Sequence, residues 1–142
     1  MKESERIQVI DQSLSKLLKL VKKKRVKIAI SLTGNTIEII KKIRPHIINE
    51  LRTLIKLGYI ELIGSGYSQI IQPLVPNELN EKNIKYGLES YKKYFEIVPE
   101  TACCNEGVYS FSGAKILEKF KYKNLIMEWN NFYKNNMHLD KS

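Results

Sequence analysis

The chain has 142 residues, the length of one globular domain with a core of its own. Its composition, with 43% hydrophobic and 27% charged residues, excludes a disordered chain, a collagen-like repeat and a disulfide-stapled miniprotein. The 24 Lys and Arg residues against 15 Asp and Glu give a net charge of +9, which raises the question of a nucleic-acid or other anionic partner.

The excess positive charge lies at the two ends of the chain. Residues 1–27 carry a net charge of +6 and residues 113–142 carry +3, whereas residues 28–112 are neutral overall. The basic run from Lys22 to Lys27 is one local cluster at the end of a helical pattern, without the interleaved aromatic residues that single-strand binders use. We therefore expect a solvated helix end and no nucleic-acid partner.

The first half of the chain alternates between helical and strand patterns. Apolar residues at spacings of three and four predict a helix over residues 5–23. Residues 26–32 are rich in β-branched side chains and nearly all apolar from Ile28 to Leu32, as in a strand that is covered on both faces. Residues 36–57 are helical, with Pro45 marking either a kink or the first turn of a new helix, and residues 59–63 are the next predicted strand.

The second half repeats this order. After a long loop to about residue 80, apolar spacing predicts a helix over residues 84–95, and a strand follows at residues 101–104. A short helix over residues 114–120 and a last strand over residues 124–127 complete the pattern. The predicted strands therefore begin near residues 26, 59, 101 and 124.

Repeated βα units of this kind predict an α/β fold with parallel strands, because right-handed crossovers make consecutive strands parallel. The loops after the strands then gather at one edge, where α/β sheets and barrels place their sites. Four strands are too few to close a barrel of about eight strands. We therefore expect one partial domain over residues 1–142, either a small open sheet or a piece of a larger barrel, with open edges that allow self-association.

Other sequence features exclude several classes of site. Two adjacent cysteines, Cys103 and Cys104, supply neither a disulfide framework nor a metal-ligand cluster, and His46 and His138 have no companions for one. The charged N-terminus is not a secretory signal, and no apolar run reaches membrane-spanning length. We expect a cytoplasmic protein without a metal, a cofactor or a membrane partner.

Polar residues follow each of the four predicted strands, so all four groups are expected to face one crevice. The groups are Ser31, Thr33, Gly34 and Asn35; Glu61, Gly64, Ser65, Gly66, Tyr67 and Gln69; Asn105, Glu106, Tyr109 and Ser110; and Glu128, Trp129 and Asn130.

Glu106 is the most informative of these residues, because it closely follows a strand and has no neighbouring cation in the sequence. A carboxylate held there can act as a nucleophile or general base, with Asn105 and Tyr109 as hydrogen-bond donors. The more common explanation is a carboxylate at the start of the following helix, stabilised by the helix dipole. The residues alone leave both explanations open and favour the second.

Three further strand-end residues carry weaker signals. Glu61 lies in an otherwise apolar strand, where a buried structural hydrogen bond is a more common role than catalysis. Glu128 and Trp129 together suit the face of a sugar, although a Trp at a strand end more often packs against a core or its rim.

Four segments in order, ISLTGN, GYIELIGSGYSQIIQPLVP, VPETACCNEGVYS and YKNLIMEWNN, resemble the catalytic (β/α)7-barrel domain of glycoside hydrolase family 57, in the wider group that includes polysaccharide deacetylases. The resemblance covers about residues 26–131 and leaves residues 132–142 as a polar tail. It implies part of a (β/α)7-type barrel and a carbohydrate substrate of the α-glucan type.

The resemblance also implies roles for individual residues. Glu106 takes the place of the nucleophile of a retaining mechanism, and Glu61 takes the place of the Glu in the family's Gly-x-x-Glu-x-x-Gly segment. Gln69 stands where family members commonly have His, which leaves the identity of the sugar open. The other residues expected to bind substrate are Tyr67, Asn105, Tyr109, Glu128 and Trp129.

Two family motifs have no counterpart in the chain. No His-x-Pro strand precedes residue 26, and no strand with the family's general-acid Asp follows the last motif. We therefore expect part of a longer glycosidase or transglycosidase that is inactive on its own. The alternatives are a non-catalytic carbohydrate-binding or assembly module and, weakened by its missing ligands, a metal-dependent deacetylase.

Overall fold

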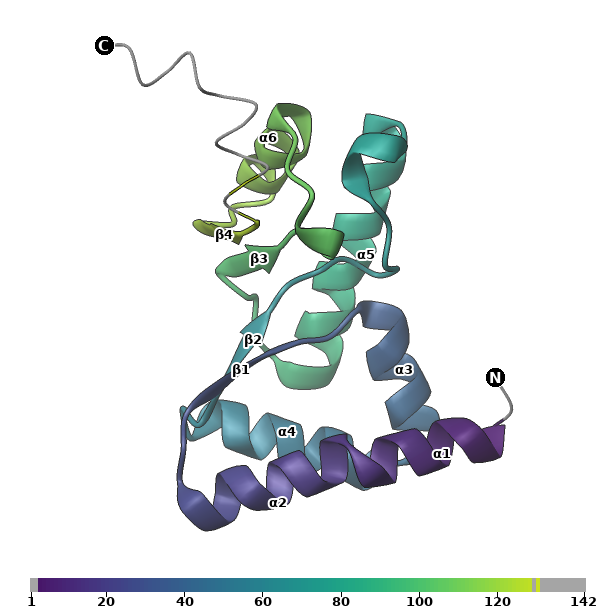
Figure 1. Ribbon diagram of the computed structural model, residues 1–142, viewed down its shortest axis with the longest axis vertical. Helices are drawn as coiled ribbons and strands as arrows, with labels where there is room; N and C mark the ends of the chain where they lie inside the picture. Colours follow the sequence, from purple (N-terminus) through teal and green to yellow (C-terminus); the bar gives the residue numbers. More distant parts are fainter. Residues whose placement is uncertain (1–2, 129, 131–142) are drawn as a thin grey trace.

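Helices and strands alternate along the chain in the computed structural model, which describes residues 3–128 and residue 130 (Figure 1). The first six elements are a helix pair, a strand, a second helix pair and a second strand. They are α1 (Glu3–Gln12), α2 (Leu14–Lys24), β1 (Ile28–Ser31), α3 (Gly34–Ile43), α4 (Pro45–Lys56) and β2 (Ile60–Ile63).

The next six elements continue this order, with a short 3-10 helix after each of two strands. They are η1 (Gln72–Leu74), α5 (Asn77–Phe95), β3 (Thr101–Cys103), η2 (Asn105–Gly107), α6 (Phe111–Lys119) and β4 (Asn124–Ile126). None of the helices in the described part of the chain has both the length and the apolar composition required to cross a membrane.

The helix predicted over residues 5–23 is divided at Ser13 into α1 and α2, so the prediction of one continuous helix is wrong at this residue. The Ser13 hydroxyl donates to the Val9 carbonyl oxygen at 2.5 Å, and the Ser13 amide donates to the same oxygen at 2.9 Å. A serine that bonds back to the preceding turn bends a helix. The apolar pattern continues through Ser13, so periodicity does not reveal the bend.

Prolines set two of the helix starts. Pro45 occupies the first turn of a new helix, where its missing amide costs no hydrogen bond, and Arg44 before it has a non-helical φ of −143°. Helix α5 begins after Pro76, seven residues before the predicted start at residue 84. Its first two turns are mostly polar, so apolar periodicity predicts only the buried part of this helix.

The four strands are parallel and lie in chain order. β1 pairs with β2, and β3 pairs with β4. Gly64 joins the two pairs, because its amide donates to the Thr101 carbonyl oxygen at 2.9 Å and its carbonyl oxygen accepts from the Cys103 amide at 2.8 Å. The predicted α/β class with consecutive parallel strands is therefore confirmed.

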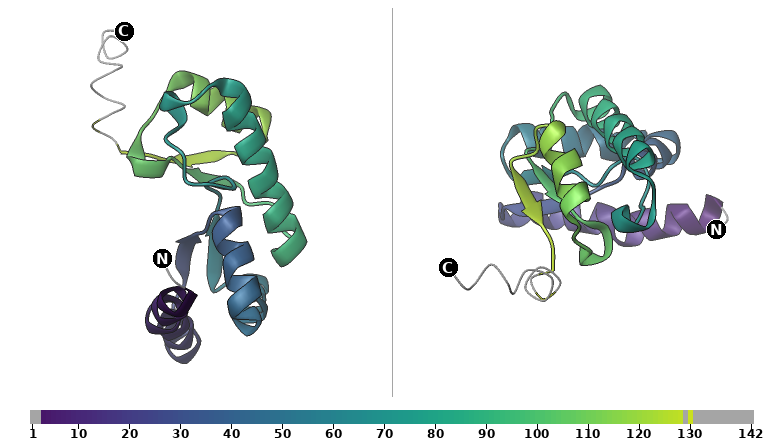
Figure 2. Two further views of the ribbon diagram at one scale, coloured as in Figure 1. Left: turned by 90° about the vertical axis from the view of Figure 1, so that its right-hand side faces the viewer. Right: turned by 90° about the horizontal axis from the view of Figure 1, so that it is seen from above.

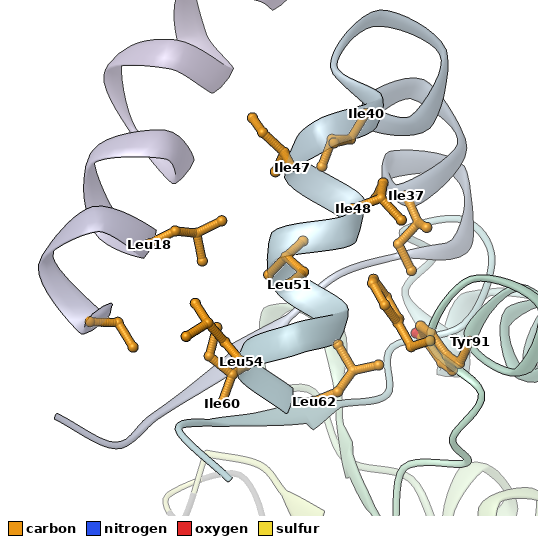
Figure 3. Packing of buried hydrophobic residues seen from close by; sticks show 12 residues of the cluster. Leu18, Ile37, Ile40, Ile47, Ile48, Leu51, Leu54, Ile60, Leu62 and Tyr91 are labelled. Carbon is orange, nitrogen blue, oxygen red and sulfur yellow. The ribbon is translucent and has the colours of Figure 1, made fainter. Parts of the chain in front are cut away.

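The main hydrophobic core lies between the β1–β2 pair and helices α2 to α5 (Figure 3). Ile60 and Leu62 enter it from β2, and Tyr91 and Phe95 enter it from α5. Burial of an aliphatic side chain stabilises a fold by about 1.5–3 kcal/mol relative to exposure. The helices contribute Leu18, Val21, Ile37, Ile40, Ile47, Ile48, Leu51 and Leu54, and a smaller cluster of Ile84, Ala102, Ile116 and Leu117 lies between α5, β3 and α6.

Alternate strand residues face away from these helices. Ala29, Ser31 and Glu61 on the first strand pair are exposed, as are Asn124 and Ile126 on β4. Successive side chains of a strand point to opposite faces, so one face of the sheet packs against the helices. The other face is solvated at these five residues, whereas Ile63 and Thr101 on it are buried. Helix α5 runs along the packed side past both strand pairs (Figures 1 and 2).

Candidate active site

A tyrosine from α5 joins the carboxyl ends of β1 and β2. The Tyr91 hydroxyl donates to the Leu32 carbonyl oxygen at 2.8 Å and accepts from the Ser65 amide at 2.9 Å. Burial raises the pKa of Tyr91, so its hydroxyl stays protonated at neutral pH. The loops after β1 and β2 therefore leave the sheet from positions that one buried hydroxyl holds together.

The loop after β2 is clamped onto α5. Asn83 accepts from the Ser68 amide at 2.7 Å and donates to the Ser68 carbonyl oxygen at 3.1 Å. Gly66 has a φ of 82°, and a Cβ on it would lie 2.4 Å from Asn83 Nδ2, so this turn requires glycine. The clamp sets the direction in which residues 69–72 leave the turn.

Glu106 lies in the single turn η2, directly after β3, with a left-handed φ of 56° and ψ of 20°. The other non-glycine residues with positive φ in the described chain are Arg25, Glu96 and Lys121, and each ends or directly follows an α-helix. Helix ends commonly adopt this conformation, whereas Glu106 follows a strand. Backbone strain outside such ends costs about 1–3 kcal/mol and is concentrated at functional sites.

Two hydrogen bonds connect the β2 loop to the Glu106 turn. Gln69 Nε2 donates to Glu106 Oε1 at 3.3 Å, and Asn105 Nδ2 donates to the Ile70 carbonyl oxygen at 2.9 Å. Glu106 is exposed, so a side-chain amide orients one of its oxygens while the carboxylate stays accessible. The Asn105 side-chain amide therefore donates to the backbone of the β2 loop and not to the Glu106 carboxylate.

β4 brings Glu128 to the same turn. The Glu128 amide donates to the Gly107 carbonyl oxygen at 3.1 Å. A Cβ on Gly107 would lie 2.9 Å from the Glu128 Cβ, so a glycine permits this close approach. The structure thus gathers Gln69, Asn105, Glu106 and Glu128 at one edge of the sheet, and their roles toward a substrate stay predictions.

Glu61 lies on the exposed face of the strands. Its Oε1 accepts from Thr101 Oγ1 at 3.1 Å, and Thr101 Oγ1 accepts in turn from Asn124 Nδ2 at 3.5 Å. The structural hydrogen bond expected from the sequence is present, but Glu61 is exposed rather than buried. The three side chains form a polar row across β2, β3 and β4.

Two tyrosines expected in the crevice have other neighbours. The Tyr67 hydroxyl donates to Glu38 Oε2 on α3 at 2.9 Å. Tyr109 lines a cavity of about 430 Å³ with Phe111, Tyr122 and other residues of α6 and β4. Trp129, the remaining predicted substrate-binding residue, lies outside the described residues.

The decisive comparison is with a family model, which is described as glycosyl hydrolase family 57 and matches residues 5–142. The chain belongs to glycosyl hydrolase family 57. This confirms the resemblance of the four strand-end motifs. No match to the sequence is found among curated proteins.

Solved enzymes share the fold of this family 57 chain. A 4-alpha-glucanotransferase from Thermococcus litoralis matches 90% of the chain with a TM-score of 0.83 and 17% identity, and the alpha-amylase AmyC from Thermotoga maritima matches 87% with a TM-score of 0.76 and 12% identity. A family 57 branching enzyme from Thermococcus kodakaraensis, in complex with glucose, matches 62% with a TM-score of 0.54 and 26% identity. The chain spans 20%, 34% and 19% of these three proteins, respectively.

Glu106 is not a carboxylate at the start of the following helix, so this explanation from the sequence is wrong for the family 57 chain. Helix α6 begins at Phe111, and Ser110 caps it by accepting from the Gly113 amide at 3.1 Å. Glu106 lies in the separate turn η2, outside the first turn of α6. Because the helix dipole acts within the first turn, α6 does not account for the carboxylate.

Of the two adjacent cysteines, Cys104 is buried and Cys103 is partly buried. Cys103 and Cys104 are free thiols, and burial raises the pKa of Cys104 to about 11, which leaves little thiolate at neutral pH. Within residues 3–128 and 130, no group of three or more His, Cys, Asp or Glu side chains is arranged to hold a metal ion.

Two residues that organise the site were not identified from the sequence. Apolar spacing predicts the helix that carries Tyr91 but gives no role to its hydroxyl, and it gives no signal for Asn83. A signal exists, because Asn83, Gly87 and Tyr91 recur every four residues and therefore share one face of α5. A Cβ on Gly87 would lie 2.5 Å from the carbonyl carbon of Gly66, so this face meets the β2 loop at contact distance.

Proposed function

We propose that this family 57 chain carries the nucleophile side of a glycosidase or transglycosidase site for α-linked glucan, with Glu106 as the nucleophile. Three proteins that share the fold are named as a 4-alpha-glucanotransferase, an alpha-amylase and a branching enzyme, which supports an α-glucan. The observation that carries the proposal is the strained backbone of Glu106 at the carboxyl end of β3, which holds an exposed carboxylate beside Gln69.

The chemistry follows from this geometry. Glu106 attacks the anomeric carbon, a bond from its carboxylate oxygen to that carbon forms, and the bond to the glycosidic oxygen breaks. A second carboxylic acid, about 5 Å away in retaining enzymes, protonates the departing oxygen. Water or a sugar hydroxyl then displaces Glu106 and restores the configuration. Gln69 donates to Oε1, so it orients the carboxylate and leaves Oε2 for attack.

The proton donor is assigned to no described residue, and family resemblance places it on a later strand of a longer barrel. The proposed nucleophile is therefore tested with a substrate whose leaving group needs no proton. In an α-glucosyl fluoride with a second fluorine on the ring, the bond from the anomeric carbon to fluorine breaks and fluoride leaves. The fluorinated sugar stays bound to the carboxylate as a slowly hydrolysed glycosyl ester. We expect one hexosyl adduct per chain by intact mass, and peptide mapping should place it on Glu106.

Three variants sharpen this experiment. Glu106→Gln should form no adduct, whereas Glu61→Gln and Glu128→Gln should still form it, because these residues are not the proposed nucleophile. An adduct on another carboxylate would overturn the assignment of Glu106. Absence of any adduct together with measurable binding of maltoheptaose would overturn the catalytic proposal and favour the non-catalytic carbohydrate-binding module.

The binding module is the second candidate function. One observation favours it, because the described residues place exposed polar side chains, among them Gln69, Glu106 and Glu128, at one edge of the sheet. Such an edge can bind a carbohydrate without a pair of catalytic carboxyl groups. Hydrolysis of an unmodified maltooligosaccharide, lost in Glu106→Gln, would exclude a purely binding role.

A further inference from the structure

A cleft between α3 and α5 has no role in the proposed reaction. It has a volume of about 340 Å³, within the range of about 300–1,000 Å³ that is typical of small-molecule sites. Its lining combines two aromatic rings, two carboxylates, a hydroxyl and an ammonium group. The residues are Glu38, Tyr67, Tyr86, Glu89, Ser90 and Lys93.

Close packing of the two helices builds the floor of the cleft. A Cβ on Gly34 would lie 2.7 Å from Tyr67 Cδ2 and 2.8 Å from Ser90 Oγ, so the start of α3 rests directly on these side chains. Ser90 is buried, and its hydroxyl donates to the Tyr86 carbonyl oxygen at 3.0 Å. The floor is therefore formed before any ligand arrives.

The walls present aromatic rings. The centroids of Tyr67 and Tyr86 lie 6.4 Å apart with an interplanar angle of 77°, an edge-to-face pair. Tyr86 is 51% exposed, so its ring is available at the rim. Tyr86, Glu89 and Lys93 follow one another at spacings of three and four residues and so share one face of α5.

The polar groups of the cleft include negatively charged acceptors, a positively charged donor and neutral hydroxyls. Tyr67 donates to Glu38 Oε2, and this hydrogen bond raises the pKa of Tyr67, so its hydroxyl stays protonated. Contact with Tyr94 and, to a smaller extent, the charge of Glu38 raise the pKa of Lys93, so its ammonium stays charged. Glu89 adds a second carboxylate at the rim.

This combination selects the chemical class of ligand. An anion would face Glu38 and Glu89, and a metal ion or an amine would face the Lys93 ammonium. A neutral polyhydroxyl ring matches all groups, because its C–H face packs on a tyrosine ring while its hydroxyls donate to carboxylates and accept from the ammonium. We propose that the α3–α5 cleft is a second carbohydrate site that binds one pyranose unit of a neutral glucan chain.

The cleft is distinct from the Glu106 site but shares a loop with it. Tyr67 and Gln69 are two residues apart after β2, and the clamp between Asn83 and Ser68 lies between them. Tyr67 contacts Glu38, whereas Gln69 contacts Glu106. One loop thus carries a residue to each site, and the second site does not depend on Glu106 being catalytic.

Titration of the chain with maltoheptaose, followed by backbone amide NMR, tests the proposal. We expect shifts at Tyr86, Glu89 and Lys93, with the same apparent affinity in Glu106→Gln, because these residues belong to the cleft. Tyr86→Ala should weaken the apparent affinity obtained from these shifts at least tenfold, and Glu89→Gln should weaken it several-fold. Both residues are exposed, so neither change removes core packing.

Matched controls use the same substitutions elsewhere. Phe111→Ala removes a 69% exposed ring on α6, and Glu78→Gln removes a carboxylate about three turns before Glu89 on α5, so both should leave the cleft shifts unchanged. The proposal is overturned if maltoheptaose leaves the cleft resonances in place, if Tyr86→Ala keeps the affinity of the unmodified chain, or if putrescine shifts them more strongly than the sugar does. If the unmodified chain forms no adduct on Glu106 but maltoheptaose still shifts the cleft resonances, the result contradicts only the proposed reaction.

Discussion

Tyr91 shows how much one hydroxyl can organise in this chain. The phenol ring belongs to the main core, and the hydroxyl meets backbone groups that follow β1 and β2 (Figure 3). The two strands are 28 residues apart at their closest, so a residue on a third element sets the relative position of their loops. Both proposed sites use the loop that starts at this hydroxyl.

We expect Tyr91→Phe to lower the free energy of unfolding by about 1–3 kcal/mol, because it leaves a partly buried carbonyl oxygen and a partly buried amide without this partner. Urea denaturation followed by circular dichroism measures this loss. Tyr86→Phe is the matched control, since Tyr86 is 51% exposed, and it should change the free energy by less than about 0.5 kcal/mol. Equal stabilities of Tyr91→Phe and the unmodified chain would show that the hydroxyl does not hold the strand ends.

At the scale of elements, α1 is attached to the junction between α3 and α4 by an ion pair. Arg44 Nε donates to Asp11 Oδ1 at 3.0 Å, and Arg44 Nη2 donates to Asp11 Oδ2 at 2.8 Å. This bidentate contact lowers the pKa of Asp11. α1 contributes no fully buried residue, and Ile10 packs partly buried against the main core, so the ion pair adds a polar link between α1 and the rest of the fold.

We expect Asp11→Asn to lower Tm by about 1–3 °C at pH 7, the small effect of a partly exposed ion pair. Asp11 has a lower pKa in the folded chain than in the unfolded chain, so its contribution is present above about pH 4 and is lost as the pH falls below it. The difference in Tm between the two proteins should therefore shrink toward pH 3. Glu118→Gln, which breaks an exposed pair with Lys115 within α6, is the control for general charge effects.

The element boundaries show where sequence patterns succeed. The strands lie within their predicted ranges because each has side chains that are at least partly buried, and Pro45 marks a helix start because proline has no amide to donate. Apolar periodicity predicts neither the bend at Ser13 nor the polar start of α5, since neither interrupts or extends an apolar period.

At the scale of the whole molecule, the sheet of the described chain has two edge strands, β1 and β4. The Ile28 amide donates to the Tyr59 carbonyl oxygen, so the amide of the next residue, Ala29, faces the open edge of β1. Unpaired edges of this kind bind other strands unless charge or proline blocks them.

We expect the isolated chain to self-associate as its concentration rises, and Ala29→Lys to shift it toward monomer by placing a charge on the β1 edge. Sedimentation velocity over a range of concentrations measures the change. Gln12→Lys adds the same charge on α1, away from the sheet, and should leave the association unchanged. A chain that stays monomeric at every concentration would contradict this use of the edges.

The sequence by itself determined the α/β class and the parallel order of strands, because alternating apolar periods encode which side of each element is buried. Its four strand-end motifs carried the resemblance to the family. Only the tertiary structure decided how the strand-end residues are divided between the Glu106 site and the α3–α5 cleft. Gln69 and Glu106 meet, whereas Tyr67, two residues before Gln69, turns to Glu38. Loops have no period that encodes direction, so contacts between distant residues, such as Asn83 with Ser68, decide where each side chain lies.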